Sequence, residues 1–427
     1  MSSNVTGSVG VNQIKLTDLI DDCLEHIFLY LDYDDLIRVA HTNKQLKPAA
    51  DMAFMGKAGK KKFRLHVANS RRISDVTEHT FEVFKLKTSL RLLRCFGHLM
   101  SKLHIDTFHA INPNPSRDLN LVLRYAKEFC AETLTKLSLH YISDGVFDSV
   151  ITKPFAKVEN VEILRCKLGV NMTNFNAWFP AMRRLELTSN HFVDCTAIAM
   201  HFPHLEHLGI VGGGMLQTKF IRDAIRLNKQ LTSFALDRAY SPEFFRYVSK
   251  LLPQLVDVKF RGYPKDFCAF RDNVINFKGV KKLEIGFIGG MEQQTVSNIK
   301  LSFDRLEEIT LDLAKYNCDS GLFTFLKQHQ SIVTLTLRSS IDSTETPNIN
   351  EGLLTDIVQT LPLLSELNFF GVYFSIDDLC ELLNNFNLLK YSFSVENSLL
   401  FDNLKIRLDN KWQATIDDGC VKVERNI

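Results

Sequence analysis

Apolar and polar residues follow one recurring pattern through most of the chain. The pattern reads apolar, two variable residues, apolar, one variable residue, apolar, and it recurs eleven times after residue 133. The segments that carry it are LTKLSL (134–139), VENVEI (158–163), MRRLEL (182–187), LEHLGI (205–210), LTSFAL (231–236), LVDVKF (255–260), VKKLEI (280–285), LEEITL (306–311), IVTLTL (332–337), LSELNF (364–369) and LLKYSF (388–393). MSKLHI (100–105) fits the same pattern. Successive segments after residue 133 begin 23 to 32 residues apart, so the chain is a repeat protein.

Each repeat predicts a strand, and several predict a helix after it. The last three positions of the pattern alternate apolar, variable, apolar, which is typical of a strand with one buried face. Between two such strands, SPEFFRYVSKLLPQ (241–254) has apolar residues at helical spacing, with Ser241 at the N-cap and Pro242 at the first helical position. SIDDLCELLNN (375–385) predicts a second helix, with acidic residues near its start.

Residues 76–403 resemble the leucine-rich repeat family in its longer strand–helix form. MRRLELTSN (182–190) carries the whole family motif, with Asn190 at the loop position, and VENVEILRC has Cys166 there, as the cysteine-containing subclass does. The other repeats carry neither residue at that position, so the asparagine ladder of the family is mostly missing. The resemblance implies an α/β solenoid, a horseshoe with parallel strands on its concave face and helices on its convex face.

The segment before the repeats predicts a small helical domain at residues 12–55. Leu24, Ile27, Phe28 and Leu31 form one apolar helical stripe, and the acidic turn after them marks where a second helix begins. Two or three short helices in about 40 residues cannot bury enough surface to be stable alone. This domain therefore needs a partner.

The same segment resembles an F-box. The residues that fall at matching positions are Leu19, Asp21, Asp22, Leu24, Ile27, Phe28, Leu31, Asp35 and Leu36. Ile20 stands where the family usually has proline, and Leu46 where it has tryptophan. The alternative is an ordinary helical cap on the repeat array. An F-box followed by leucine-rich repeats implies docking on the Skp adaptor of a cullin–RING ubiquitin ligase. The adaptor-binding residues that this resemblance implies are Leu19, Ile20, Leu24, Ile27, Phe28, Leu31 and Leu36.

Three further segments lie outside these two parts. Residues 1–11 predict a disordered N-terminus. Residues 56–75 predict a linker, in which KAGKKKFR (57–64) is read as a solvated basic stretch, with a nuclear-localisation patch as the alternative. Residues 404–427 alternate like two or three strands and predict a C-terminal β cap on the open end of the array.

Composition narrows the choice of compartment and partner. The chain has 51 basic and 49 acidic residues, so its net charge of +2 gives no argument for nucleic acid or an anionic membrane as a partner. Its nine cysteines are scattered without zinc-site spacing, which is typical of reduced thiols. The N-terminus lacks the regions of a signal peptide, and no apolar run approaches the roughly 20 residues that span a bilayer. We therefore expect a cytoplasmic or nuclear protein.

Two groups of residues are candidates for chemistry, and we reject both. His201, His204 and His207 have the spacing of metal ligands on one helix, but a proline interrupts the helix and His207 belongs to the next strand. His191 and Cys195 have no evident orienting acid. We therefore predict no catalytic residue, no metal and no cofactor.

Three glycines in LEHLGIVGGGMLQ (205–217) raise another hypothesis, a nucleotide-dependent enzyme. Gly212 and Gly214 have the spacing of a dinucleotide-binding loop, and Asp237 ends the next apolar segment. Gln217, however, stands at the third glycine position, and the preceding strand alternates, whereas Rossmann strands are apolar on both faces. We predict instead that the glycines form the turn where one repeat leaves its strand.

Residues between the buried leucines of a leucine-rich repeat array face outward and bind partners. The substrate-binding residues predicted on this basis are Arg184, Glu186, His207, Asp237, Lys259, Arg261, Glu284, Glu308, Asp312, Arg338 and Phe370. Their charges alternate in sign, which suits a protein partner better than a phosphate backbone.

These observations predict a non-catalytic, substrate-recognition subunit of a Skp–cullin–F-box ubiquitin ligase. The F-box would bind the Skp-family adaptor, and the repeats would hold an unknown target protein for ubiquitination and degradation. The alternative is a leucine-rich-repeat interaction or inhibitor protein with no ligase role, in which the first helices are only a cap.

Overall fold

The computed structural model of the protein describes residues 15–58, 62–66, 80–83, 85–107, 115–142, 153–168, 175–192, 199–213, 218–237, 242–262, 274–287, 301–312, 325–338, 353–371, 390–394, 412–417 and 420–425. Two compact units make up the chain. The first comprises Met1–Lys167 and Asn171–Met182, and the second comprises Leu168–Val170 and Arg183–Ile427.

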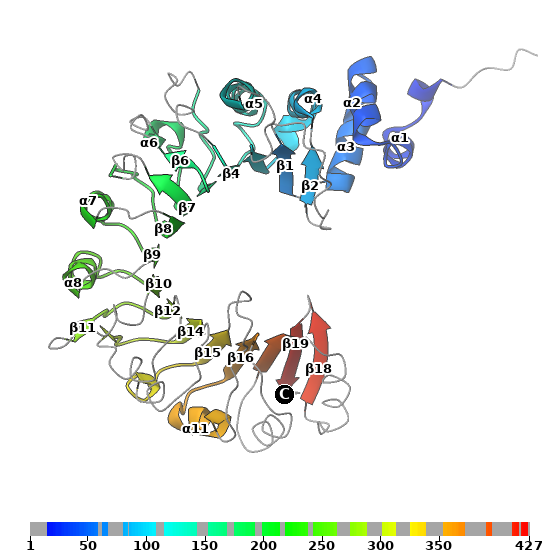
Figure 1. Cartoon of the computed structure of the whole chain (residues 1–427). Helices are drawn as coiled ribbons and strands as arrows, with labels where there is room; N and C mark the ends of the chain where they lie inside the picture. Colours follow the sequence, from blue (N-terminus) through cyan, green and yellow to red (C-terminus); the bar gives the residue numbers. More distant parts are fainter. Residues whose placement is uncertain are drawn as a thin grey trace, which may run out of the picture. The chain divides into compact units, whose positions relative to one another are not determined.

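The first unit begins with helices and continues with alternating strands and helices (Figure 1). Its helices include η1 (Leu16–Asp18), α1 (Asp21–Phe28), α2 (Tyr33–Thr42), α3 (Lys47–Ala58), α4 (Leu86–Phe96), η2 (Gly97–Leu99), α5 (Pro115–Phe129) and α6 (Phe175–Trp178). Its strands include β1 (Lys62–His66), β2 (Thr80–Val83), β3 (Lys102–Asp106), β4 (Lys136–His140) and β5 (Asn160–Leu164). These strands form a parallel sheet in the order β2, β1, β3, β4, β5. The short strand β6 (Lys167–Leu168) lies where the chain passes into the second unit.

The N-terminal helical segment, residues 15–58, forms the helices that its apolar stripe predicts. Asp32 caps α2, because its Oδ1 accepts a hydrogen bond from the Asp35 backbone N–H at 2.7 Å. Helix α1 follows Ile20, whose side chain cannot accept such a bond and leaves the first N–H groups of the helix without a side-chain cap. The two helix starts therefore differ in how well the sequence stabilises them.

Phe54 of α3 ties the N-terminal helical segment to the first repeats. Its ring is fully buried and stacks on Phe96 of α4 and on Phe63 of β1, with ring centroids 4.3 Å and 5.3 Å away. Tyr33 of α2 meets the same ring edge-on at 6.2 Å. Large aromatic side chains dominate the energetics of a core when they are buried together. The segment is thus packed onto the repeats.

The interval 56–75, predicted as a linker, contains parts of two elements. Helix α3 continues to Ala58, and β1 pairs in parallel with both β2 and β3. Phe63 and Leu65 of β1 alternate as a strand requires and are buried, but they are only two apolar residues beside a run of lysines. Because of this run of lysines, the sequence pattern did not predict the strand. The sheet begins with β1, before residue 76, where the repeats were predicted to start.

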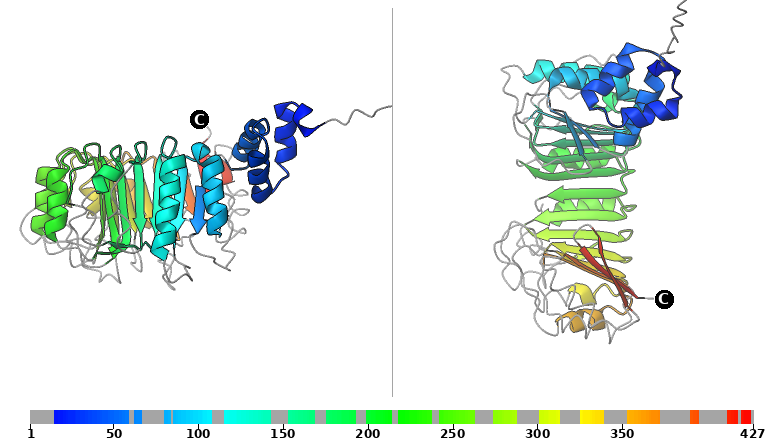
Figure 2. Two further views of the ribbon diagram at one scale, coloured as in Figure 1. Left: turned by 90° about the horizontal axis from the view of Figure 1, so that it is seen from above. Right: turned by 90° about the vertical axis from the view of Figure 1, so that its right-hand side faces the viewer.

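The second unit is a succession of strands with helices along one side (Figures 1 and 2). Its strands include β7 (Arg184–Phe192), β8 (His207–Gly213), β9 (Ser233–Asp237), β10 (Asp257–Gly262), β11 (Ile275–Asn276), β12 (Lys282–Phe287), β13 (Leu301–Ser302), β14 (Glu308–Asp312), β15 (Thr334–Arg338), β16 (Glu366–Phe370), β17 (Lys390–Ser394), β18 (Trp412–Asp417) and β19 (Cys420–Arg425). Its helices include α7 (Thr218–Leu227), α8 (Pro242–Leu251) and α11 (Leu353–Thr360).

Pairing in the second unit is parallel from β7 to β17. The strand order is β7, β8, β9, β10, β12, β14, β15, β16, β17, and the strands are in register. After β17 the sheet continues with β19 and β18, which are antiparallel. Strands β11 and β13 form a separate parallel pair. In the segments from 182 to 369 the apolar side chains of the repeat pattern are buried, and the residues between them form the opposite face of the sheet.

The strands occur where the repeat pattern predicts them. Each of the eleven segments contains a strand, MSKLHI contains β3, and helix α8 occupies most of 241–254. The helix expected at 375–385 lies outside the described residues. The chain is an α/β solenoid, built from units that each bury their apolar face against the next. Among the described residues, no helix combines the length and the apolar character needed to cross a lipid bilayer.

A left-handed backbone position that recurs at the end of several strands explains Gly212, whereas Gly214 lies outside the described residues. Gly212 has φ of 65°, and the same left-handed backbone occurs in four other described residues: Tyr141, Arg165, Ser189 and Gly371. Each of the five follows the first apolar residue of its segment by seven positions. A left-handed backbone is costly for residues with a Cβ, so its recurrence marks a required turn of the repeat. The Gly212 N–H donates to Asp237 Oδ2 at 2.7 Å, so the glycine and the acid that suggested a dinucleotide site join neighbouring repeats.

Candidate functional site

Exposed apolar side chains gather on the N-terminal helical segment. Six of the ten large apolar side chains that are exposed among the described residues lie there, and we name them the apolar patch: Leu16, Ile20, Ile27, Tyr30, Met52 and Met55. Ile20 is 67% exposed and Tyr30 is 84% exposed. Isolated exposed apolar residues are ordinary, but their concentration on one short segment is typical of a surface that binds a partner.

The seven residues predicted to bind an adaptor divide into two groups. Leu24, Phe28 and Leu36 are almost completely buried in this structure and form the core of α1 and α2, so contact with a partner stays a prediction for them that their burial does not favour. The predicted residues with exposed or half-buried side chains are Ile20, Ile27, Leu19 and Leu31. A helical stripe contains both core and surface positions, and the sequence pattern alone does not separate them.

The sequence pattern missed four of the six residues of the apolar patch. Leu16 precedes the first matched position, Leu19. Tyr30 follows α1 and lies outside its apolar stripe, while Met52 and Met55 belong to α3, which the matched positions do not reach. The available signal was the spacing of the two methionines, which are three residues apart and therefore share one face of α3. Helix α3 packs against α1, where Gly56 lies beside Leu29.

The second candidate site is the polar face of the second unit, the sheet face opposite its buried apolar residues. All of the residues predicted to bind a substrate lie on its strands, from Arg184 in β7 to Phe370 in β16. The register aligns them in rows across the sheet. One row runs His207, Ser233, Asp257, Lys282, Glu308, and another runs Arg261, Gly286, Asp312, Arg338, Phe370.

A chain of hydrogen bonds and ion pairs crosses four strands of the polar face. Arg184 pairs with Glu186 at 2.6 Å, and Glu186 Oε1 lies 2.7 Å from His207 Nε2. His207 Nδ1 lies 2.7 Å from Ser233 Oγ, and the Ser233 hydroxyl donates to Asp257 Oδ2 at 3.0 Å. Both ring nitrogens of His207 therefore face oxygen atoms. Four consecutive repeats therefore share one polar network.

Gly209 makes room for the carboxylate of Glu186. A Cβ at Gly209 would lie 1.7 Å from Glu186 Oε2, so a larger residue would drive the carboxylate away from His207. Burial by itself raises the pKa of Glu186, but the hydrogen bond and charge of His207 and the charge of Arg184 outweigh it. The pKa of Glu186 is consequently held below its usual value of 4.5.

We expect Glu186→Gln to destabilise the protein at pH 7 and not at low pH. A carboxyl whose pKa is lowered by folding adds stability above its unfolded pKa and loses it as the pH falls through the folded pKa. The variant should lose about 1.5–3 kcal/mol at pH 7, the usual range for a hydrogen bond to a charged group. Urea unfolding of both proteins at pH 7 and at successively lower pH below 4.5 measures the gap, which should close.

Gly209→Ala serves as the matched variant, because it displaces the carboxylate without removing it. It should reproduce most of the loss at pH 7. A gap between wild type and Glu186→Gln that stays constant down to low pH would show that the ionised carboxylate is not the source of the stability.

A second group of charges, which we name the ionic cluster, occupies β10 to β15. Its members are Lys259, Arg261, Glu284, Asp312 and Arg338. Lys259 lies 2.7 Å from Glu284, and Arg338 also contacts Glu284. Arg261 and Arg338 each approach Asp312 to 3.8 Å, and Arg261 is also 3.8 Å from Glu284. Three cations around two carboxylates leave one positive charge in excess.

Gly286 allows the ionic cluster to form. It stands between Arg261 and Asp312 in the register, and a Cβ there would lie 2.7 Å from Arg261 Cγ. The absence of a side chain lets Arg261 lie across β12 and reach a carboxylate two strands away. Charges joined in a network of this kind are held in place more firmly than isolated surface pairs. The cluster thus presents a fixed pattern of charge.

The remaining predicted residues do not join these groups. Glu308 pairs with Lys282 at 2.7 Å, and this hydrogen bond raises the pKa of Lys282. Phe370 is half-buried at the register position next to Arg338. Asp237 accepts the hydrogen bond from Gly212.

The histidines rejected as a metal site are separated in the structure as well. His201 Nδ1 lies 2.9 Å from the Leu227 carbonyl oxygen, while His207 is buried in β8 beside Glu186. Cys195, the proposed companion of His191, lies outside the described residues.

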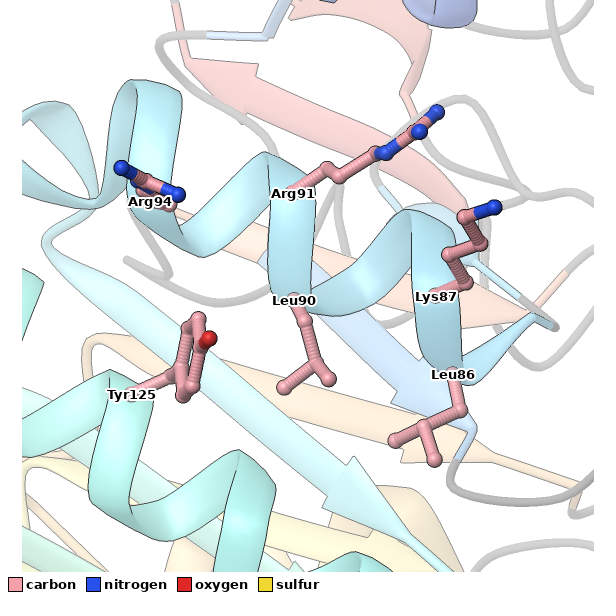
Figure 3. Close-up of a pocket in the computed structure, with 6 residues that line it drawn as sticks. All are labelled: Leu86, Lys87, Leu90, Arg91, Arg94 and Tyr125. Atoms are coloured by element: carbon pink, nitrogen blue, oxygen red, sulfur yellow. The ribbon is translucent and has the colours of Figure 1, made fainter.

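A groove of about 310 Å³ between α4 and α5 involves none of the predicted residues (Figure 3). It is lined by Leu86, Lys87, Leu90, Arg91, Arg94 and Tyr125. Leu86 and Leu90 point toward the helix that carries Tyr125, whereas Lys87 and Arg91 point away from it. The groove therefore has an apolar floor and a basic rim.

Comparison with protein families settles the nature of the first segment. Residues 16–53 match the F-box domain family. The chain carries an F-box domain. This match contains η1, α1 and α2 and the first part of α3, and it includes every member of the apolar patch except Met55.

Two examples illustrate the solved structures that are similar to the chain. One is a chain in the crystal structure of the Rad7 and Elc1 complex in yeast, with 10% identity, a TM-score of 0.39, and coverage of 82% of this chain and 88% of that chain. The other is the crystal structure of the TLR13–ssRNA13 complex, with 14% identity, a TM-score of 0.32, and coverage of 75% of this chain and 51% of that chain. A comparison with curated proteins finds no match.

Proposed function

We propose that this chain is the substrate-recognition subunit of a Skp–cullin–F-box ubiquitin ligase. The observation that carries the proposal is the F-box domain at residues 16–53 with its apolar patch. F-box domains bind Skp-family adaptors, and the proteins that contain them are typically non-catalytic receptors. On this proposal the adaptor covers the apolar patch. Two of the predicted adaptor-binding residues, Ile20 and Ile27, then contact it.

The repeats have a separate role in the same proposal. We infer that they are leucine-rich repeats, because parallel strands recur at the period of that family and a left-handed turn occurs at the same position of several repeats. Their polar face would hold the target protein. Alternating charges within hydrogen-bonded rows favour a protein surface of complementary charge over a nucleic acid, whose recognition needs one dominant sign.

The proposed mechanism is proximity and needs no catalytic group in this chain. An adaptor bound to one part and a target bound to the other would be held together, which raises the effective concentration of the target near the ligase. We place this activity in the cytoplasm or nucleus, where reduced thiols such as the buried Cys95, Cys130 and Cys166 are the rule.

Co-purification of the full-length chain with a recombinant Skp-family adaptor tests the proposal. We expect a stable complex that survives gel filtration. Failure to form it would favour the alternative, a repeat protein that binds or inhibits its partner without a ligase role. Removal of residues 1–55 is a poor control, because it deletes Phe54 from the core of the first unit.

Exchanging the charges of one ion pair tests the polar face. In the double variant Lys282→Glu with Glu308→Lys, the pair at 2.7 Å is kept but its sign pattern is reversed. A partner with complementary charges then meets like charges, so we expect its binding to weaken by about tenfold or more. Quantitative affinity purification with wild-type and variant chains gives the recovery of each bound protein.

The neighbouring pair supplies a matched control. Lys281 and Glu307 also lie 2.7 Å apart with similar exposure, but each is one residue before its strand. The exchange Lys281→Glu with Glu307→Lys should leave the recovery of partners unchanged. Equal effects of the two exchanges would indicate that the polar face does not select the target.

A further inference from the structure

Two histidines and an aspartate meet on the first unit, and none of the three belongs to either candidate site. His104 and Asp106 lie on β3 and His140 lies on β4, and the register places His140 directly beside Asp106. Their potential ligand atoms all lie within 4.8 Å of one another. The rings of His104 and His140 have centroids 3.8 Å apart, and His104 Nε2 is 3.9 Å from Asp106 Oδ2. His104 and Asp106 are buried, and His140 is half-buried.

The three groups have the spacing that a bound metal ion requires. Nitrogen and oxygen atoms about 2.1 Å from a common ion lie roughly 3–4 Å apart, so small side-chain rotations would close the triangle. Two imidazoles and one carboxylate suit zinc and other first-row transition ions, whereas magnesium and calcium prefer oxygen ligands. All three residues lie on strands, and strands position ligands more accurately than loops do.

The backbone around the three residues is fixed. The His140 carbonyl accepts a hydrogen bond from the Thr107 N–H at 3.2 Å, which ties the end of β4 to the end of β3. The next residue, Tyr141, adopts the left-handed turn and donates its N–H to the Leu164 carbonyl at 3.0 Å. The ends of these strands therefore cannot drift apart without loss of these bonds.

Arg64 of β1 is the existing cationic neighbour of the carboxylate. Its Nε lies 3.9 Å from Asp106 Oδ2, and its side chain is partly exposed. The guanidinium thus places a positive charge beside the carboxylate. A divalent ion would compete with Arg64 for the carboxylate, and the partial exposure of the arginine gives it room to move into solvent.

We propose that His104, Asp106 and His140 form a binding site for a first-row transition metal ion. Three protein ligands leave at least one coordination position for water or for a group of a partner. The site is independent of the proposed ligase role, because neither the apolar patch nor the polar face of the second unit contributes to it.

Zinc binding by the full-length chain tests the proposal. After the chain is stripped with a chelator, calorimetric titration with zinc should show one site per chain. His140→Ala should lower the affinity on the order of 100-fold or more, since loss of groups that only support a ligand costs 10–100-fold. Arg64→Met should raise it about tenfold, because a competing like charge is removed. Thermal unfolding of each variant without zinc verifies that it is folded.

Two controls separate this site from other donors in the chain. His98 lies 3.3 Å from Asp51, and no third ligand joins this histidine–carboxylate pair within the described part of the chain, so His98→Ala should bind zinc as wild type does. Cobalt substitution should give a spectrum without the thiolate charge-transfer band that binding to cysteine would produce. Asp106→Asn repeats the test of the ligand set at unchanged side-chain volume, should His140→Ala fail to fold. A chain that binds no zinc, or zinc affinity that is the same in wild type, His140→Ala and Asp106→Asn, would overturn the proposal.

Discussion

Ile20→Asp is expected to abolish adaptor binding while making helix α1 more stable. Ile20 is the N-cap residue of α1 and is 67% exposed, with no side-chain bond to the helix. In a complex it would bury an isoleucine side chain, worth about 1.5–3 kcal/mol, and the substituted carboxylate would also have to lose its water. We therefore expect binding of a Skp-family adaptor, measured by calorimetry on the full-length chain, to weaken on the order of 100-fold or more.

The opposite sign of the stability change makes this result specific. Aspartate is among the best N-cap residues and isoleucine among the worst, so the substitution should stabilise α1 by about 0.5–1 kcal/mol. Asp21 and Asp22, which already occupy the first turn, place the gain at the lower end through charge repulsion. Loss of binding together with an unchanged or raised unfolding temperature cannot come from unfolding.

Leu363→Asp is the matched control, since Leu363 is an exposed apolar residue of the second unit with 59% of its surface accessible. It should bind the adaptor as wild type does. If Ile20→Asp binds the adaptor with unchanged affinity, the apolar patch is not the contact surface, and the helices are better explained as a cap on the solenoid.

The sequence was sufficient for the strands of the repeat pattern because each of them follows from a local rule. An alternation such as Val258, Lys259, Phe260 buries every second residue whatever lies on the neighbouring strand. The turn that follows was also accessible, since Gly212 marked it, but Tyr141 and Arg165 take the same left-handed backbone without any compositional sign.

The contacts of the candidate sites could not be predicted in the same way, because they join residues from different repeats. Arg261 reaches Asp312 only because Gly286 intervenes, and this depends on the register of three strands. His104 and His140 are 36 positions apart, and their meeting also depends on register. Burial was ambiguous for a related reason: Leu24 and Ile27 share one apolar stripe, yet only Leu24 is in the core.

Phe54→Ala is expected to loosen the F-box helices from the first repeats. The ring is fully buried and stacks between Phe63 and Phe96. An alanine side chain is too small to fill the space that the ring occupies between α3, β1 and α4. Truncation of a buried phenylalanine to alanine costs about 3–5 kcal/mol, which is a large part of the stability of an ordinary domain. Hydrogen exchange measured by mass spectrometry should show faster exchange throughout α1, α2 and α3.

A buried phenylalanine elsewhere distinguishes this effect from general destabilisation. Phe234 of β9 is equally buried in the second unit, so Phe234→Ala should raise exchange around β9 and leave α1 to α3 protected. Normal protection of α1 to α3 in Phe54→Ala would mean that the F-box helices are stable without their contact to α4 and β1.

Under the packed arrangement, an adaptor on the apolar patch is held in a fixed orientation to the first repeats, because Phe54 leaves no free hinge between them. The same substitution should therefore impair target ubiquitination more than it impairs adaptor binding.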